Sequence, residues 1–266
     1  MIAKSDLCIY AIGGGHGHAT RSISLAKELH KQKKYKQIEL LCSKESVKYI
    51  RDLPSFIKLH HMSWLDFLRL KVKDFRSDLI VDTFPCGVVN EIDKEHLGYF
   101  KSTHIVARYN SKEADKENYQ CYDQVWLPYL ELNCEWEGSF SKDAKYIGLQ
   151  VDKDKVKCIF ESGKFVLIDP YKIIPSELKI KIRDFSQNEG FEYSYLTRFT
   201  KDIYAEKVFV IGAGYNTFYE WLDSPVDIKF MPLKRKYDDQ YYRAKRYNKD
   251  LCSLVEFIDW IQEREV

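Results

Sequence analysis

Apolar residues in the first half of the chain gather into short runs separated by polar segments. The runs at 7–12 and 38–42 have the length of strands, and the segment 19–31 between them repeats apolar side chains at helical spacing. A strand, a crossover helix and a second strand predict a βαβ unit with parallel strands. Further short runs of apolar or β-branched residues predict strands at 79–81, 103–107 and 124–127.

A second series of the same kind follows the polar segment 138–154. Strands are expected at 164–168, 191–196, 207–211 and 226–231, and helices at 176–187, at 215–222 and at 251–261. Alternating strands and helices indicate parallel sheets that are covered on both faces. We therefore predict an α/β protein with two Rossmann-like, doubly wound domains, residues 1–150 and 151–266, that face a cleft.

The composition is consistent with two small domains, and it bears on the expected ligands and on the cell compartment. The 266 residues are 45% hydrophobic, and 42 Lys and Arg against 40 Asp and Glu give a net charge of +2, too small to gather a polyanion by a general field. The seven cysteines are odd in number and never spaced C-x-x-C, which favours neither a disulfide framework nor a zinc site. No apolar run approaches the roughly 20 residues needed to cross a bilayer. We expect a cytoplasmic protein without a transmembrane segment.

The segment 13–21, GGGHGHATR, combines a glycine loop with the start of a helix. Such a loop lets the backbone approach a ligand, and a helix start favours negative charge. A dinucleotide fingerprint would need glycine at His18 and an acidic residue after the strand that ends at Cys42. His18 instead has the position of a general base that deprotonates a hydroxyl group, with helix capping as the alternative. His16 and Arg21 are candidates for contact with an acceptor or phosphate, and a catalytic share for His16 stays open.

Asp82 closes the apolar strand at 79–81, and ligands of open parallel sheets bind outside the carboxyl ends of the strands. Its carboxylate can orient a histidine, accept a hydrogen bond from a sugar or act as a base, but the turn formed by Pro85 and Gly87 makes a structural cap an equal alternative. Arg108 follows the strand at 103–107 and can meet a phosphate or an acidic acceptor, the alternative being a surface salt bridge.

In the second half, the strand at 207–211 runs into Gly212-Ala-Gly214 and then a helix, which predicts a second phosphate-binding loop. Glu220 lies about two turns into that helix, within reach of a ribose diol. Asp239 and Gln240 begin another helix and offer hydrogen-bonding groups for sugar hydroxyls.

Four motifs in this order resemble those of the GT-B glycosyltransferases: Gly-x-Gly-His-x-x-Arg, Asp-x-Phe-Pro-x-Gly, Gly-Ala-Gly-Tyr-Asn-Thr-x-x-Glu and Asp-Gln-x-x-Arg-Ala. Within that fold the chain is similar to the group that includes the peptidoglycan N-acetylglucosaminyltransferase. The chain departs from the group in being short and in carrying His16 where the motif has glycine. The resemblance therefore does not identify the acceptor.

The resemblance implies a role for each matching residue. His18 is the base or the group that orients the acceptor, with Asp82 as its support or its replacement. The residues implied to bind the donor are Gly14, Gly15, Gly17, Gly212, Gly214, Tyr215, Asn216, Thr217, Glu220, Arg235, Asp239 and Gln240. Within this set Gly212, Gly214 and Thr217 face the phosphates, Glu220 the ribose, and Asp239 with Gln240 the transferred sugar. Arg235 or Arg243 stabilises the departing diphosphate.

The expected function is transfer of a sugar from a nucleotide-sugar to an acceptor hydroxyl, and the expected donor is a UDP-sugar. We expect the reaction to invert the anomeric centre and to need no essential metal or other cofactor. The acceptor is a small molecule, a lipid-linked glycan or, as a minority hypothesis from the basic and aromatic segment 234–246, a hydroxylated base in DNA. A nucleotide-sugar epimerase and a non-catalytic nucleotide-sugar binder are the alternatives.

Overall fold

The computed structural model describes residues 6–13, 16–48, 50, 53–69, 77–107, 116–128, 144–148, 150–151, 157–199, 202–235 and 240–263. The chain divides into two compact units, Met1–Val151 and Asp152–Val266. The boundary expected at residue 150 lies next to this division. Each unit is described by itself below.

The first unit is built on a seven-stranded parallel sheet. Its strands are β1 (Leu7–Ala11), β2 (Ile38–Cys42), β3 (Ile57–His61), β4 (Asp78–Asp82), β5 (Ser102–Val106), β6 (Gln124–Leu127) and β7 (Lys145–Tyr146). The order is β3-β2-β1-β4-β5-β6-β7, so the chain first builds outward from β1 on one side and then returns to build on the other. The point where the direction reverses, the switch point, lies between β1 and β4.

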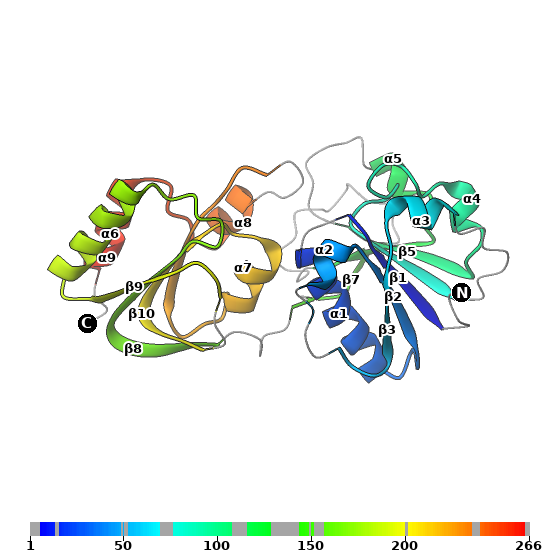
Figure 1. The fold of residues 1–266 in the computed structure, drawn as a ribbon, viewed down its shortest axis with the longest axis horizontal. Coiled ribbons are helices and arrows are strands. Elements are labelled where there is room, and N and C mark those ends of the chain that lie inside the picture. The colour runs from blue at the N-terminus through cyan, green and yellow to red at the C-terminus, as the bar shows by residue number, and fades with distance from the viewer. Residues whose placement is uncertain are drawn as a thin grey trace. The chain divides into compact units, whose positions relative to one another are not determined.

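Helices cover both faces of this sheet (Figure 1). Leu7, Ile9 and Ala11 pack in a buried cluster with Ala19 and Leu25 of α1 (His16–Lys31). On the opposite face lie α3 (Trp64–Arg69), α4 (Lys94–Leu97) and α5 (Lys116–Tyr119), while α2 (Lys44–Val47) follows β2 directly. The alternation of side chains along β1 therefore supplies both layers of the core.

The second unit has a four-stranded parallel sheet in the order β11-β10-β8-β9. Its strands are β8 (Lys157–Ile168), β9 (Glu192–Leu196), β10 (Asp202–Ile211) and β11 (Asp227–Met231). β9 lies on one side of β8, and the chain then crosses to the other side for β10 and β11. The switch point of this sheet is therefore between β8 and β10.

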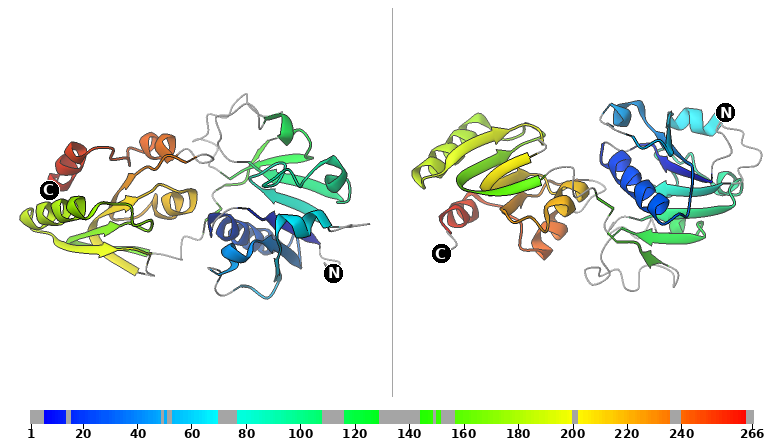
Figure 2. Two further views of the ribbon diagram at one scale, coloured as in Figure 1. Left: turned by 45° about the horizontal axis from the view of Figure 1, so that its top comes forward. Right: turned by 90° about the horizontal axis from the view of Figure 1, so that it is seen from below.

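Helices lie on both faces of the second sheet (Figures 1 and 2), and aromatic side chains pack between the sheet and the helices. α6 (Ser176–Asn188) and α9 (Leu254–Gln262) share one face, where the ring centroids of Phe165 and Phe257 are 5.8 Å apart. α7 (Tyr215–Trp221) and α8 (Gln240–Arg246) follow β10 and β11. Phe218 of α7 lies 5.0 Å, between ring centroids, from Phe230 of β11.

The prediction of an α/β fold is confirmed, and the two parallel sheets are compatible with a Rossmann-like architecture. Most predicted elements are present. The first helix begins at His16 rather than at residue 19, β8 begins at Lys157 rather than at residue 164, and β10 begins at Asp202 rather than at residue 207. The short elements β3, β7, α2, α3, α4 and α5 were not predicted. In the part of the chain that the structure describes, no helix combines the length and the apolar character required to span a bilayer.

Candidate active site

His18 and Asp82 meet at the switch point of the first sheet. His18 lies in the first turn of α1, directly after β1, and Asp82 is the last residue of β4. Because β1 and β4 are neighbouring parallel strands, their carboxyl ends lie at the same edge of the sheet. This is the edge at which ligands of open α/β sheets bind.

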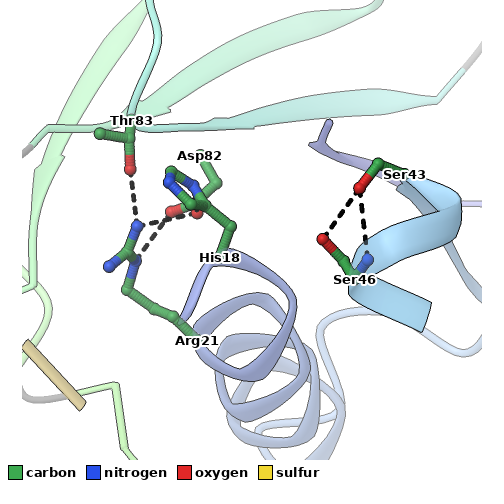
Figure 3. A network of polar contacts seen from close by, with 6 residues as sticks. All are labelled: His18, Arg21, Ser43, Ser46, Asp82 and Thr83. Atoms are coloured by element: carbon green, nitrogen blue, oxygen red, sulfur yellow. Dashed lines mark hydrogen bonds and ion pairs between the residues drawn. The ribbon is translucent and has the colours of Figure 1, made fainter. Parts of the chain in front are cut away.

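Hydrogen bonds join these two residues to Arg21 and Thr83 (Figure 3). Nδ1 of His18 lies 2.7 Å from Oδ2 of Asp82. Arg21 donates from Nε to Oδ1 and from Nη2 to Oδ2 of the same carboxylate, both at 2.8 Å, and Nη2 is also 2.6 Å from Oγ1 of Thr83. The paired contacts from a planar guanidinium fix the orientation of the carboxylate as well as its charge.

The network is buried, and its carboxylate is ionised. The exposed fractions of His18, Arg21 and Asp82 are 4%, 1% and 2%. Burial by itself raises the pKa of Asp82, but the nearby Arg21 guanidinium and then His18 outweigh it and hold the pKa well below its usual range. Asp82 is therefore a carboxylate near neutral pH and accepts hydrogen bonds from both partners.

The residues that follow Asp82 shape the surroundings of the histidine. Thr83 has a φ of 84°, an uncommon value for a residue with a branched side chain, and its amide donates to the carbonyl of Val106 at 3.0 Å. The turn brings Phe84 against His18, with ring centroids 5.2 Å apart and planes inclined by 19°. The imidazole is thus held by a carboxylate at one edge and by an aromatic ring on one face.

Glu91 anchors the loop that follows this turn and was not predicted as part of the site. It is buried, accepts hydrogen bonds from the amides of Val88 at 3.0 Å and Val89 at 2.8 Å, and also accepts from the hydroxyl of Tyr10. The anchored loop places Val88 over Gly13, where a Cβ would come within 1.7 Å of Cγ2 of the valine. Gly13 is therefore required by packing and by its φ of 97°, independently of any ligand.

Two serines were also missed by sequence reasoning. Ser43 follows β2, caps α2 by accepting from the amide of Ser46 at 3.3 Å, and lies 3.0 Å from Oγ of Ser46. Figure 3 shows this hydroxyl pair at the edge of the sheet that holds His18 and Asp82. The signal in the sequence was a serine directly after an apolar strand, which is typical of a helix cap.

In the second unit, Gln240 and Arg243 hold the loops at the carboxyl ends of β10 and β11. Oε1 of Gln240 accepts from the amide of Ala213 at 2.8 Å and from that of Leu233 at 3.0 Å. Nη1 of Arg243 donates to the carbonyl of Ala213 at 2.5 Å. Gln240 and Arg243 are 3% and 6% exposed, so both side chains are part of the framework of this edge.

The other residues predicted to bind the donor lie at or near the same edge. Gly214 is the N-cap of α7, Tyr215 in its first turn is buried, and Asn216, Thr217 and Glu220 on α7 are partly exposed. Gly212 has a φ of 92°, and Arg235 lies 4.7 Å from the ring centroid of Tyr171. Gly14, Gly15, Arg108 and Asp239 lie outside the described residues, as does the side chain of His16, although His16 opens α1.

The structure thus brings together two separate groups of predicted residues. His18, Arg21 and Asp82 meet in the first unit, and Gly212, Gln240 and Arg243 meet in the second. Arg21, predicted to contact an acceptor or phosphate, directs the contacts described above to Asp82 and Thr83, and its contact with a ligand remains a prediction. The described part of the chain holds no group of three or more His, Cys, Asp or Glu side chains arranged for a metal ion.

Comparison with profiles of known protein families finds no match for this chain, and comparison with curated proteins finds none either. The function is therefore argued from the geometry of these two groups and from the motifs of the sequence.

Proposed function

We propose that the protein is an inverting glycosyltransferase that moves a sugar from a nucleotide-sugar to an acceptor hydroxyl. The observation that carries the proposal is the 2.7 Å contact between Nδ1 of His18 and Oδ2 of Asp82 at the switch point of a doubly wound sheet. The resemblance of the four motifs to GT-B glycosyltransferases supports the same reading, with a UDP-sugar as the expected donor.

The geometry supports His18 as the general base. The ionised Asp82 accepts a hydrogen bond from the protonated Nδ1 of the imidazole. In this tautomer the lone pair is on Nε2. As the acceptor oxygen attacks the anomeric carbon, its proton moves to Nε2 and the bond from that carbon to the nucleoside diphosphate breaks. The positive charge that forms on the imidazole is stabilised by Asp82, which is the role of the carboxylate in other histidine bases.

Arg21 keeps Asp82 in its charged state without being a base itself. A buried carboxylate beside a neutral imidazole would tend to bind a proton, whereas the paired bonds from Arg21 favour the ionised form. In the proposed mechanism Arg21 is a positioning residue, because it acts through Asp82.

The second unit is the proposed donor side. Its loops after β10 and β11 are fastened by Gln240 and Arg243, which gives the backbone near Gly212 a fixed shape. Preorganised groups of this kind stabilise the charge on a departing diphosphate. Metal-independent turnover is part of the proposal.

The test is release of nucleoside diphosphate from UDP-, GDP- and dTDP-sugars, measured without and then with candidate acceptors. The wild type is compared with His18→Ala, Asp82→Asn and His96→Ala. His96 is the matched control, because its Nδ1 also lies 2.7 Å from a carboxylate, that of Asp93, whose side chain is 60% exposed.

We expect acceptor-dependent release that continues in EDTA, falls about 10²-fold or more in His18→Ala and is unchanged in His96→Ala. Conversion of the donor without release would instead identify an epimerase, and tight donor binding without turnover a non-catalytic binder. Retained activity in His18→Ala with loss in Asp82→Asn would transfer the role of base to Asp82. Acceptors in the panel include a lipid-linked glycan and DNA that contains a hydroxylated base.

A further inference from the structure

The switch point of the second sheet lies between the loops that follow β8 and β10, and a tyrosine from the first loop rests against a glycine of the second. The strand order β11-β10-β8-β9 places the reversal there, and Asp169 and Gly212 are the first residues after the two strands. This is the position at which open α/β sheets bind their ligands. Tyr171 follows two residues after Asp169.

Hydrogen bonds hold the turn that carries Tyr171 in one shape. Asp169 is fully buried, and its carboxylate accepts from the amides of Ile173 and Ile174, both at 3.1 Å. Its carbonyl accepts from the amide of Lys172 at 3.1 Å, and Lys172 has a φ of 54°. The turn therefore presents Tyr171 from a fixed backbone.

The ring of Tyr171 approaches the backbone of the neighbouring strand end. A Cβ at Gly212 would lie 2.9 Å from Cε2 of Tyr171, closer than such atoms come in proteins, and the φ of Gly212 is 92°. Gly212 is thus required by its own conformation, and its lack of a side chain leaves room for the ring.

Arg235, two residues beyond Leu233, covers the same ring. Its guanidinium carbon lies 4.7 Å from the ring centroid of Tyr171, within the range of a cation–π contact. Tyr171 nevertheless remains 47% exposed, and Arg235 is also exposed. An aromatic ring and a planar cation are therefore both held at the switch point and are both accessible.

We propose that Tyr171 and Arg235 form a stacking surface for the base of the bound nucleotide. A tyrosine ring and a guanidinium plane both stack on nucleobases, and base–aromatic stacking tolerates any base because each has a π-face. The inference rests on the proposed role of the second unit as the donor side, and it adds Tyr171, which no motif of the sequence had indicated.

The test is a binding titration of UDP, GDP and inorganic pyrophosphate to the full chain, with Tyr171→Ala, Tyr171→Phe and Arg235→Lys. Tyr204→Ala is the matched control, since Tyr204 of β10 is 50% exposed and belongs to the same unit. Thermal unfolding of every variant is recorded alongside, so that loss of the fold is recognised.

We expect Tyr171→Ala to weaken the binding of UDP and GDP by about 5-fold to 150-fold and to leave the binding of pyrophosphate unchanged. Tyr171→Phe should bind like the wild type, and Arg235→Lys should lose affinity because an ammonium does not stack. Tyr204→Ala should have no effect.

Equal losses for UDP and pyrophosphate would overturn the inference, because the surface would then act on the phosphates. It would also be overturned by a wild type that binds none of the nucleotides, or by unchanged affinity in Tyr171→Ala. A failure of the proposed sugar transfer is seen separately: nucleotides would bind through Tyr171 while no acceptor gave release of diphosphate.

Discussion

Nδ1 of His18 and Oδ2 of Asp82 lie 2.7 Å apart, although 64 positions separate the two residues in the chain. Neither residue reaches the other through local structure. The contact exists because the carboxyl ends of β1 and β4 are adjacent, and because the Arg21 guanidinium stabilises a carboxylate that is only 2% exposed. Stability and the proposed chemistry therefore depend on the same three side chains.

Replacing Arg21 by leucine should destabilise the protein strongly. The change leaves the buried Asp82 carboxylate without its paired donors, and breaking a buried pair in this way costs about 3–5 kcal/mol. Urea unfolding at pH 7 measures the loss. Arg183→Ala is the control, because this exposed arginine pairs with Asp184 on the surface and should cost less than about 1 kcal/mol. Equal effects in the two variants would mean that Asp82 is not charged.

The difference in unfolding free energy between the wild type and Asp82→Asn should depend on pH. The pKa of Asp82 is lowered in the folded state, so its stabilising contribution is complete above the unfolded value of about 3.9 and is lost as the pH falls toward the lower folded value. Unfolding free energies of both proteins, measured between pH 7 and pH 2.5, should converge as the pH decreases. A difference that grows on acidification would show that the pKa is raised instead.

Gly13 and Gly17 should respond in opposite ways to a methyl group, although both belong to the same glycine loop. In Gly13→Ala the new methyl group would collide with Val88, and alanine would have to adopt a φ of 97°, so we expect the unfolding free energy to fall by about 1–3 kcal/mol. In the double variant with Val88→Gly, only the part of this loss that comes from the collision should be recovered. Gly17 lies in α1 with nothing within 4 Å of a Cβ, so Gly17→Ala should leave stability unchanged or raise it by up to about 1 kcal/mol.

Unfolding in urea compares these glycine variants, and the release assay then adds a functional test. If Gly17→Ala folds normally but loses turnover, the open space beside Gly17 is needed by a ligand. Normal turnover in Gly17→Ala would remove this glycine from the predicted donor contacts. A stable Gly13→Ala protein would contradict the packing of Val88 described above.

The sequence predicted best those elements that are buried on both faces. β2 and β6 occupy the predicted residues, because both are buried apart from the half-buried Gln124 and both are apolar apart from Glu39 and Gln124. β3 was missed because an edge strand with mostly half-exposed or exposed residues has no such run. The first part of β8 is largely exposed as well, which explains why only its buried end, near Phe165, was predicted.

The meeting of His18 and Asp82 could be predicted from the sequence only as far as the order of the strands could be predicted. His18 and Asp82 each follow an apolar run, and the rule for parallel sheets brings such residues to one edge. The partner of Arg21 was not predictable, because an arginine near a glycine loop reads equally well as a contact for an external anion. No sequence pattern indicated Tyr171 as a site residue. Its place at the second switch point depends on the strand order, in which the chain crosses from β9 to β10 on the other side of β8.

Lys207 should prove to be the anchor of the C-terminal helix. It is 3% exposed on β10, and its Nζ donates to the carbonyls of Trp260 and Glu263, at the end of α9. Carbonyls at the end of a helix have no partner within the helix and carry partial negative charge, so a cation stabilises them. Trp260 in turn donates from Nε1 to the Asp227 carboxylate at 2.5 Å, which joins the helix to β11.

Lys207→Met keeps most of the length of the side chain but removes its donors, and it should cost about 1–3 kcal/mol because the buried carbonyl of Trp260 and the partly buried carbonyl of Glu263 lose a partner. Hydrogen exchange should accelerate first in residues 254–263 and much less in α6, which packs on the same face of the sheet. Lys164→Met is the matched control, since this lysine of β8 pairs with Glu161 at the surface. Faster exchange spread evenly over the second unit would mean that α9 unfolds together with the sheet, and that Lys207 stabilises the whole unit instead of the helix alone.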